Sequence, residues 1–212
     1  MALNQGNQGQ TGKQVGQNLT ASFGEYADTL VTELMPRYYE QAYRGQTYFN
    51  SITNAAVTAY SGASGGTPLL GVWNPANSGK NLIIIHAMVS VYTAASAAGT
   101  CAFRLYAGVT AAITGTLVSP VSSLTFTSTG GGSVARASQN AANSSSTALT
   151  YINTIGSYYW ATAAGAVMTN PLLYDCAGSL IIPPGSMIGL GGSVALTSAT
   201  YDAFILWSEA FI

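Results

Sequence analysis

Residues 82–92 read LIIIHAMVSVY, and this stretch decides the fold class. Every second position from 83 to 91 is apolar, as in a strand with one buried face: Ile83, Ile85, Ala87, Val89 and Val91. A membrane span is the alternative for so apolar a segment, but polar residues such as His86 and Ser90 interrupt it. The stretch therefore predicts a buried β-strand, and no membrane is expected as a partner.

Segments on the C-terminal side extend the pattern. Residues 100–106 place Cys101, Phe103 and Leu105 opposite Ala102, Arg104 and Tyr106, and residues 201–212 alternate in the same way. Shorter strands are expected near 121–126, 148–155, 172–175, 179–182 and 187–190, with a Pro-Pro-Gly-Ser turn at 183–186. Residues 127–147 are expected to form a long exposed loop, and residues 158–168 are ambiguous, with a short helix as one option. Short strands between Gly-, Ser- and Asn-rich loops are typical of a sandwich or barrel.

Charged residues are few and unevenly spread. They make up 6% of the 212 residues, whereas about 25% is usual in a soluble domain. Of the thirteen (six basic and seven acidic), seven lie in the first fifty positions: Lys13, Glu25, Asp28, Glu33, Arg37, Glu40 and Arg44. We therefore expect an N-terminal arm for assembly or docking (residues 1–60), a linker (residues 61–68) and a β-sandwich domain (residues 69–212).

The arm itself has two sequence signals. Residues 1–20 are rich in Gln, Gly and Asn and have little apolar surface to bury, so we expect them to be disordered unless a partner orders them. Ser22 followed by Glu25 forms a capping box, which predicts a helix over about 22–35 that ends at Pro36.

An aromatic run with two arginines follows this helix. Tyr and Arg are enriched among the residues that anchor protein interfaces. Packing of the same residues on the sandwich is the alternative, and the sequence leaves both open. The predicted protein–protein interface combines the apolar stripe of the helix with this run: Phe23, Tyr26, Leu30, Leu34, Arg37, Tyr38, Tyr39, Tyr43 and Arg44.

The β region carries few groups for catalysis. His86 is the only histidine, and the acids there are Asp175, Asp202 and Glu209. Asp202 and Glu209 are an odd number of residues apart on one predicted strand, so they are expected on opposite faces rather than as a paired acid and base. No spaced His, Cys and acid cluster predicts a metal site, and no cofactor is expected.

Other partners follow from charge and cysteine content. The net charge is −1, and the six basic residues are scattered rather than clustered, so nucleic acid is not expected as a partner. Cys101 and Cys176 are expected to be two buried free thiols.

Two further stretches carry a family resemblance. Residues 72–85 read VWNPANSGKNLIII and residues 180–188 read LIIPPGSMI, and the chain closes on an aromatic-rich strand. Over residues 69–212 this resembles β-sandwich proteins encoded among the structural genes of tailed bacteriophages. The resemblance implies a mainly β, jelly-roll-like antiparallel β-sandwich, the fold of capsid decoration (cement) proteins and short head fibres. Such proteins are commonly trimeric and have no catalytic residues, so no enzymatic activity is expected.

The leading hypothesis is a virion structural protein on the capsid exterior, assembled in the host cytoplasm. It would bind the major capsid protein through its arm and form a homotrimer through the sandwich. One alternative is a tail or head fibre or receptor-binding head that recognises a host surface glycan, with Tyr158, Tyr159 and Trp160 as candidate exposed aromatics. Another is a tail or portal adaptor.

Overall fold

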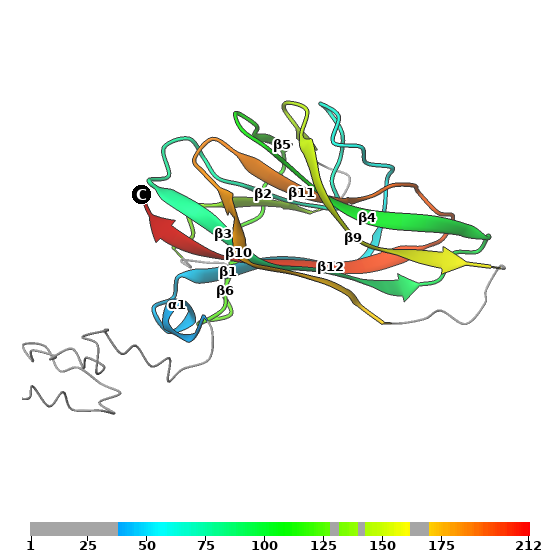
Figure 1. Ribbon diagram of the computed structural model, residues 1–212, viewed down its shortest axis with the longest axis horizontal. Coiled ribbons are helices and arrows are strands. Elements are labelled where there is room, and N and C mark those ends of the chain that lie inside the picture. The colour runs from blue at the N-terminus through cyan, green and yellow to red at the C-terminus, as the bar shows by residue number, and fades with distance from the viewer. Residues whose placement is uncertain (1–37, 128–131, 140–142, 162–169) are drawn as a thin grey trace, which may run out of the picture. The chain divides into compact units, whose positions relative to one another are not determined.

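The computed structural model describes residues 38–127, 132–139, 143–161 and 170–212 (Figure 1). The chain divides into two units, Met1–Glu40 and Gln41–Ile212, and every described strand belongs to the second. The short helix α1 (Tyr39–Tyr43) precedes the first strand. The helix expected over 22–35 lies outside the described residues and stays a prediction.

One sheet has five antiparallel strands in the order β10-β3-β12-β1-β6. Its members are β10 (Leu172–Ile182), β3 (Lys80–Thr93), β12 (Thr200–Phe211), β1 (Thr47–Ala56) and β6 (Val121–Ser122). We call it the first sheet. Its longest pairing joins β12 to β3, from Thr200 opposite Thr93 to Phe211 opposite Lys80.

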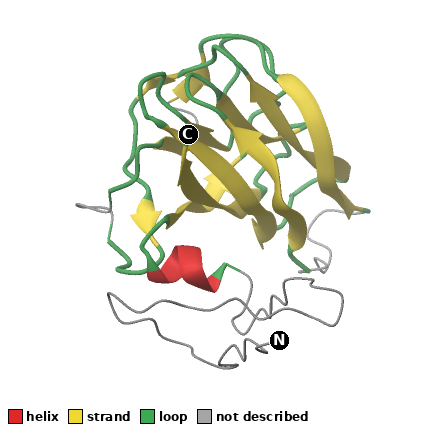
Figure 2. Ribbon diagram, turned by 60° about the vertical axis from the view of Figure 1, so that its left-hand side comes forward, coloured by secondary structure: helices red, strands yellow, loops and turns green. Residues whose placement is uncertain are grey.

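The second sheet is also five-stranded and antiparallel, in the order β7-β2-β11-β4-β9. Its members are β7 (Arg136–Gln139), β2 (Leu70–Trp73), β11 (Met187–Gly192), β4 (Gly99–Gly108) and β9 (Thr150–Trp160). A small ladder joins β5 (Ile113–Gly115) to β8 (Asn143–Ser145). Figures 1 and 2 show the two five-stranded sheets packed face to face, which confirms the β-sandwich. The chain changes sheet at each step from β1 to β4 and from β9 to β12, a connectivity compatible with a jelly roll.

The core lies between the inner faces of the two sheets. On β12 the inward residues are Tyr201, Ala203, Ile205 and Trp207, all buried as the alternation predicted. On β4 the inward residues are Cys101, Phe103 and Leu105, again as predicted, and Tyr106 of the opposite set is also buried, in a second cluster. The rings of Phe103 and Tyr201 meet edge to face across the two sheets with their centroids 4.8 Å apart.

The predicted face of residues 83–91 needs a correction. Leu82 and Ile84 are buried in the core, whereas Ile83 is only partly buried. The pairing with β12 shifts between Ile84 and His86, so Ile85 is the extra residue of a β-bulge. A bulge moves the following residues to the opposite face, and the alternation of Ala87 and Val89 therefore does not extend back to Ile83.

The boundary of the predicted arm also needs a correction, because the first sheet begins at Thr47. Strand β1 lies within residues 1–60 but pairs with β12 from Thr47 to Ala56. The inward position Asn50 interrupts its apolar pattern. The side-chain Nδ2 of Asn50 donates a hydrogen bond to the backbone O of Ser138, which satisfies this polar residue inside the sandwich. Because a polar residue occupies an inward position, the apolar alternation does not reveal the strand.

Residues 61–68 are held on the domain rather than forming an open linker. Gly65 N donates to Ser145 O, and Ser145 N donates to Gly66 O. Gly62 has φ +78° and lies against the Tyr106 ring, where a Cβ would come within 2.6 Å, so only glycine fits.

Four further expectations are revised. The expected loop over 127–147 contains β7 and β8, and the small residues Ala135 and Ala137 are fully buried there. Tyr158 to Trp160 end strand β9, so this part is not helical. The expected strand at 121–126 is reduced to two residues. The two expected strands at 172–175 and 179–182 are one bulged strand, β10.

Neighbouring positions of β12 test the assignment of its two faces. Ile205→Ala is expected to lower the free energy of unfolding by about 2–5 kcal/mol, because it opens a cavity in the core. Leu206→Ala, at the next and outward-facing position, is expected to cost less than about 1.5 kcal/mol. Chemical denaturation of both variants measures the difference, and equal losses would contradict the assignment.

Candidate functional site

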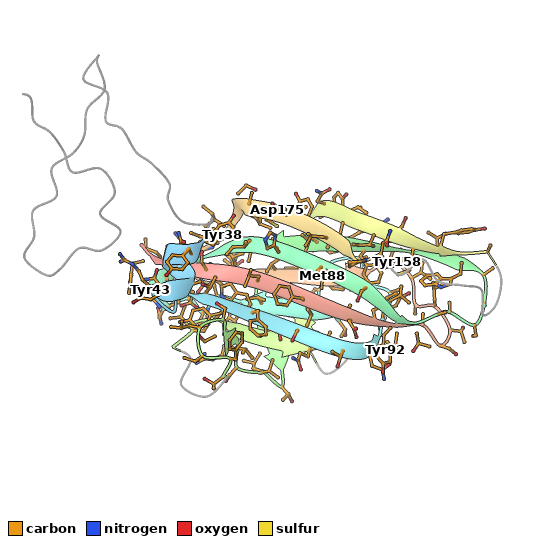
Figure 3. All side chains as sticks on the ribbon, turned by 90° about the horizontal axis from the view of Figure 1, so that it is seen from below. Tyr38, Tyr43, Met88, Tyr92, Tyr158 and Asp175 are labelled. Carbon is orange, nitrogen blue, oxygen red and sulfur yellow. The ribbon has the colours of Figure 1, made fainter. Side chains whose placement is uncertain are left out.

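The outer face of the first sheet is apolar at its centre. Its outward side chains there include Phe49 on β1, Met88 on β3, and Phe204 and Leu206 on β12, which we call the apolar face. Phe204 pairs with Met88, and Leu206 pairs with Phe49 on its other side. The Phe49 and Phe204 rings lie 5.6 Å apart, and all four side chains are partly exposed and outside the core cluster. Figure 3 labels Met88 in the middle of this sheet.

Such a face is unusual for an antiparallel sheet in contact with water. A half-solvated sheet alternates apolar residues inside with polar residues outside. Strand β12 instead has Ile205 and Trp207 in the core and Phe204 and Leu206 on the outside. A central strand that is apolar on both sides is typical of a sheet covered on both faces.

The second sheet has such a cover, supplied by the chain itself. A second apolar cluster packs on its outer side, formed by Tyr60, Tyr106, Ala111, Ile113, Leu149 and Met187. The rings of Tyr60 and Tyr106 meet edge to face at 5.0 Å. Gly191 lies so close to Tyr60 that a Cβ would come within 2.5 Å of its ring. Among the described residues, no comparable cluster covers the apolar face of the first sheet.

Two acids and the only histidine border the apolar face. His86 on β3 and Asp175 on β10 are paired across the strands, with Nδ1 and Oδ1 3.4 Å apart. Asp202 on β12 accepts a hydrogen bond from Asn54 N at 2.9 Å. Within the described ranges, neither acid forms an ion pair with a Lys or Arg. The face is therefore apolar with an acidic border.

The third acid of the β region points the other way. Glu209 is 2% exposed, whereas Asp202 on the same strand is outward, so the two lie on opposite sides of β12 as expected. Lys80 Nζ donates to Glu209 Oε2 at 3.0 Å, Ser133 Oγ donates to Oε1 at 2.6 Å, and Val134 N donates to Oε1 at 3.0 Å.

The buried Glu209 carboxylate has a structural role, because it holds neighbouring segments together. Its donors fix residues 133–134 to the edge of the core, and Lys80 also lies 5.1 Å from the centroid of the Phe211 ring. Burial, together with the Glu209 charge, raises the pKa of the Tyr48 phenol. The three acids do not converge on one point, and no group of three His, Cys, Asp or Glu side chains among the described residues is placed to hold a metal ion.

A groove of about 310 Å³ opens beside the ends of β4 and β10 and the start of β9. Its lining is mostly apolar, with Val109, Ile152 and Ile181 exposed along it. The polar residues are Thr150 and Ser186, and the lining includes no acid, base, histidine or cysteine. Its chemistry fits an apolar side chain better than a polar substrate.

The predicted interface residues are only partly described. Tyr39, Tyr43 and Arg44 are exposed on and just after α1, and Tyr38 is partly buried. The other five lie outside the described residues: Phe23, Tyr26, Leu30, Leu34 and Arg37. The docking role of this group remains a prediction.

The three aromatic residues proposed for glycan binding lie on opposite faces of strand β9. Tyr158 and Trp160 are buried in the core at the end of β9, and Tyr159 between them is exposed. The Tyr158 hydroxyl donates to Val89 O at 3.0 Å, so this residue links the two sheets. Only Tyr159 remains available to a ligand.

Sequence reading missed the apolar face. Its signal was present in residues 201–212, where both alternating sets contain large apolar side chains. The partners Phe49 and Met88 come from strands far away in the sequence, so the face becomes visible only with the strand order.

The two cysteines are free and buried, as expected. Burial raises the pKa of Cys176 to about 11, with the Asp175 charge adding to the effect, and burial also raises the pKa of Cys101. A raised pKa keeps the thiol protonated, so at pH 8 the native protein is expected to react with iodoacetamide at least about a hundredfold more slowly than the unfolded chain. Mass spectrometry of labelled protein measures this, and equal rates would contradict the burial.

The same shifts predict a loss of stability at alkaline pH. The unfolded thiol ionises near pH 9 but the folded one near 11, so protonation of Cys176 stabilises the fold fully below pH 9 and this contribution is lost as the pH rises to about 11. Burial raises the pKa of Tyr60 to about 12, which extends the decline. Thermal melts from pH 7 to 11 are expected to show a Tm that falls above pH 9. A Tm that stays constant over this range would contradict the prediction.

Removal of the buried carboxylate is expected to be costly. Glu209→Ala leaves Lys80 Nζ, Ser133 Oγ and Val134 N without their acceptor, and a loss of about 2–4 kcal/mol in the free energy of unfolding is expected. Asp202→Ala, on the outer side of the same strand, serves as the matched control and is expected to lose less than about 1 kcal/mol. A small effect for both variants would show that the hydrogen bonds to Glu209 do not stabilise the fold.

Comparisons with known proteins add no identity. No family model, no curated protein and no solved structure matches this chain. Within the described residues, no helix is long and apolar enough to cross a membrane.

Proposed function

We propose that this chain is a non-enzymatic structural protein of a virus particle, a capsid decoration protein of a tailed bacteriophage. Its N-terminal arm binds the major capsid protein, and its sandwich binds further copies of itself. The observation that carries the proposal is the apolar face of the first sheet, which the described chain leaves uncovered. A sandwich with one covered and one uncovered apolar outer face fits a subunit of a larger assembly.

The charge content supports an assembled protein. The centre of a protein interface is depleted in charged residues, and this chain has only 6% of them. Outside the Lys80–Glu209 pair, the strands of the two sheets carry only four charged side chains: Arg104, Arg136, Asp175 and Asp202. A free domain relies on surface charge for solubility, whereas a subunit in a fixed lattice does not.

The arm supports attachment to a shell. Residues 1–20 have little to bury within their own subunit and are long enough to cross neighbouring surfaces. Tyr39, Tyr43 and Arg44 then present interface-forming side chains where the arm meets the first strand. Many modest contacts over a large area suit a clamp between shell subunits.

The receptor-binding alternative has less support. Two of its three candidate aromatics, Tyr158 and Trp160, are buried in the core. A tail or portal adaptor would use the same arm and apolar face, so the choice between shell and tail depends on which particle component the arm binds.

Truncation tests the attachment. Because β1 begins at Thr47, a variant without residues 2–37 keeps every described strand and is expected to melt within a few degrees of the full chain. It is expected to lose binding to capsid shells that lack the protein, measured as occupancy after co-sedimentation. Tyr43→Ala in the full chain is expected to weaken binding about tenfold, and Asn77→Ala, in an exposed loop, serves as the control. Unchanged occupancy of the truncated protein would refute the clamp, and binding to tails but not shells would favour the adaptor.

A further inference from the structure

Outside the Lys80–Glu209 pair, the Asp, Glu, Lys and Arg side chains of the strands are separated by sheet. Asp175 and Asp202 lie on the first sheet, where the only basic side chain, Lys80, is held by Glu209. Arg104 and Arg136 lie on the second sheet, whose described strands carry no acid. One outer surface of the sandwich is therefore acidic and the other is basic.

The basic side also has exposed aromatic residues. Arg104 on β4 alternates with the buried Phe103 and Leu105, so its side chain is outward. On the adjacent strand β9, Tyr151 is 52% exposed and Tyr159 is 72% exposed. We call Arg104, Tyr151 and Tyr159 the Arg–Tyr surface.

This surface lies beyond the cover of the second sheet. The covering cluster reaches Tyr106 on β4, and Tyr151 packs beside that ring at 6.0 Å between centroids. Arg104 and Tyr159 are not part of the cluster. Tyr and Arg in this arrangement are the residue types that dominate binding energy at protein interfaces.

We propose that copies of this chain associate head to tail, with the apolar face of one copy seated on the Arg–Tyr surface of the next. The inference rests on the self-association in the proposed function and specifies its two surfaces. A tyrosine ring of the Arg–Tyr surface packs on the apolar face of the next copy. Arg104 approaches the acidic border formed by Asp175 and Asp202.

Charge determines the choice between head-to-tail and face-to-face packing. Two apolar faces stacked on each other would bring two acidic borders together, and the strands of the first sheet carry no Lys or Arg except Lys80, which pairs with Glu209. Head-to-tail packing places Arg104 of one copy near the acids of the next, and like charges in contact are costly whereas opposite charges fix the register. A contact between two different surfaces is heterologous, and it closes into a ring only when the rotation between successive copies allows it.

The test uses the full chain in two charge-reversed forms. Variant A carries Asp175→Lys and Asp202→Lys, which reverses the acidic border. Variant B carries Arg104→Glu, which reverses the Arg–Tyr surface. Each alone is expected to weaken self-association about tenfold or more relative to the wild type, measured by analytical ultracentrifugation over a concentration series.

Mixing the two variants decides the geometry. Variant A retains an intact Arg–Tyr surface and variant B an intact apolar face, so one A–B contact keeps its native charges. The other A–B contact brings the introduced acid of B against the introduced lysines of A, so the mixture is expected to regain the self-association that each variant alone has lost. A face-to-face contact predicts that B alone still dimerises, which would overturn the proposal.

Controls separate this inference from the shell-binding proposal. Circular dichroism and thermal melts establish that both variants are folded, and Asn77→Glu, which adds charge on an exposed loop, is expected to leave association unchanged. A wild type that stays monomeric at all concentrations overturns the head-to-tail contact while leaving attachment of the arm to shells to be measured by occupancy. Loss of shell binding with intact self-association would overturn only the proposed attachment.

Discussion

The structure depends on strand β12, which carries large apolar side chains on both of its faces. Its inward residues join the two sheets, as the contact between Tyr201 and Phe103 shows, and its one inward charge, Glu209, accepts hydrogen bonds from Lys80 and Ser133. Its outward residues Phe204 and Leu206 continue the apolar character on the other side. A strand of this kind needs a layer on each side, and the described chain provides only one of them.

The two sheets meet this requirement differently. The second sheet carries its own outer layer, built from Tyr60, Ile113 and Leu149 in segments that cross over it. The glycines beneath that layer allow the close approach that the covering rings require. The first sheet has an apolar centre and an acidic border instead, and this difference is the basis of the proposed self-association.

The sequence predicted regular strands well and irregular ones poorly. The alternation predicted for residues 201–212 gave the correct faces from Tyr201 to Trp207, but Phe211, which it placed with the inward set, is exposed at the end of β12. Residues 82–92 misled because the bulge at Ile85 shifts the faces, and a bulge has no signal in a list of apolar residues. Strand β1 was missed because Asn50 is buried and hydrogen-bonded, and β7 was missed because alanine and serine fill it. The candidate surface combines Phe49, Met88 and Phe204, which only the strand order brings together.

Hydroxyl-radical footprinting of Met88 tests the central claim most directly, since Met88 lies on the apolar face and its oxidation is read by mass spectrometry. The account predicts that Met88 is oxidised in dilute monomer and protected in concentrated or shell-bound protein. Met187, which is fully buried in the second sheet's covered side, is expected to stay unreactive in both states, and exposed Phe211 serves as an internal standard for radical dose. Equal oxidation of Met88 in the free and assembled states would mean that nothing covers this face, and the account would be wrong.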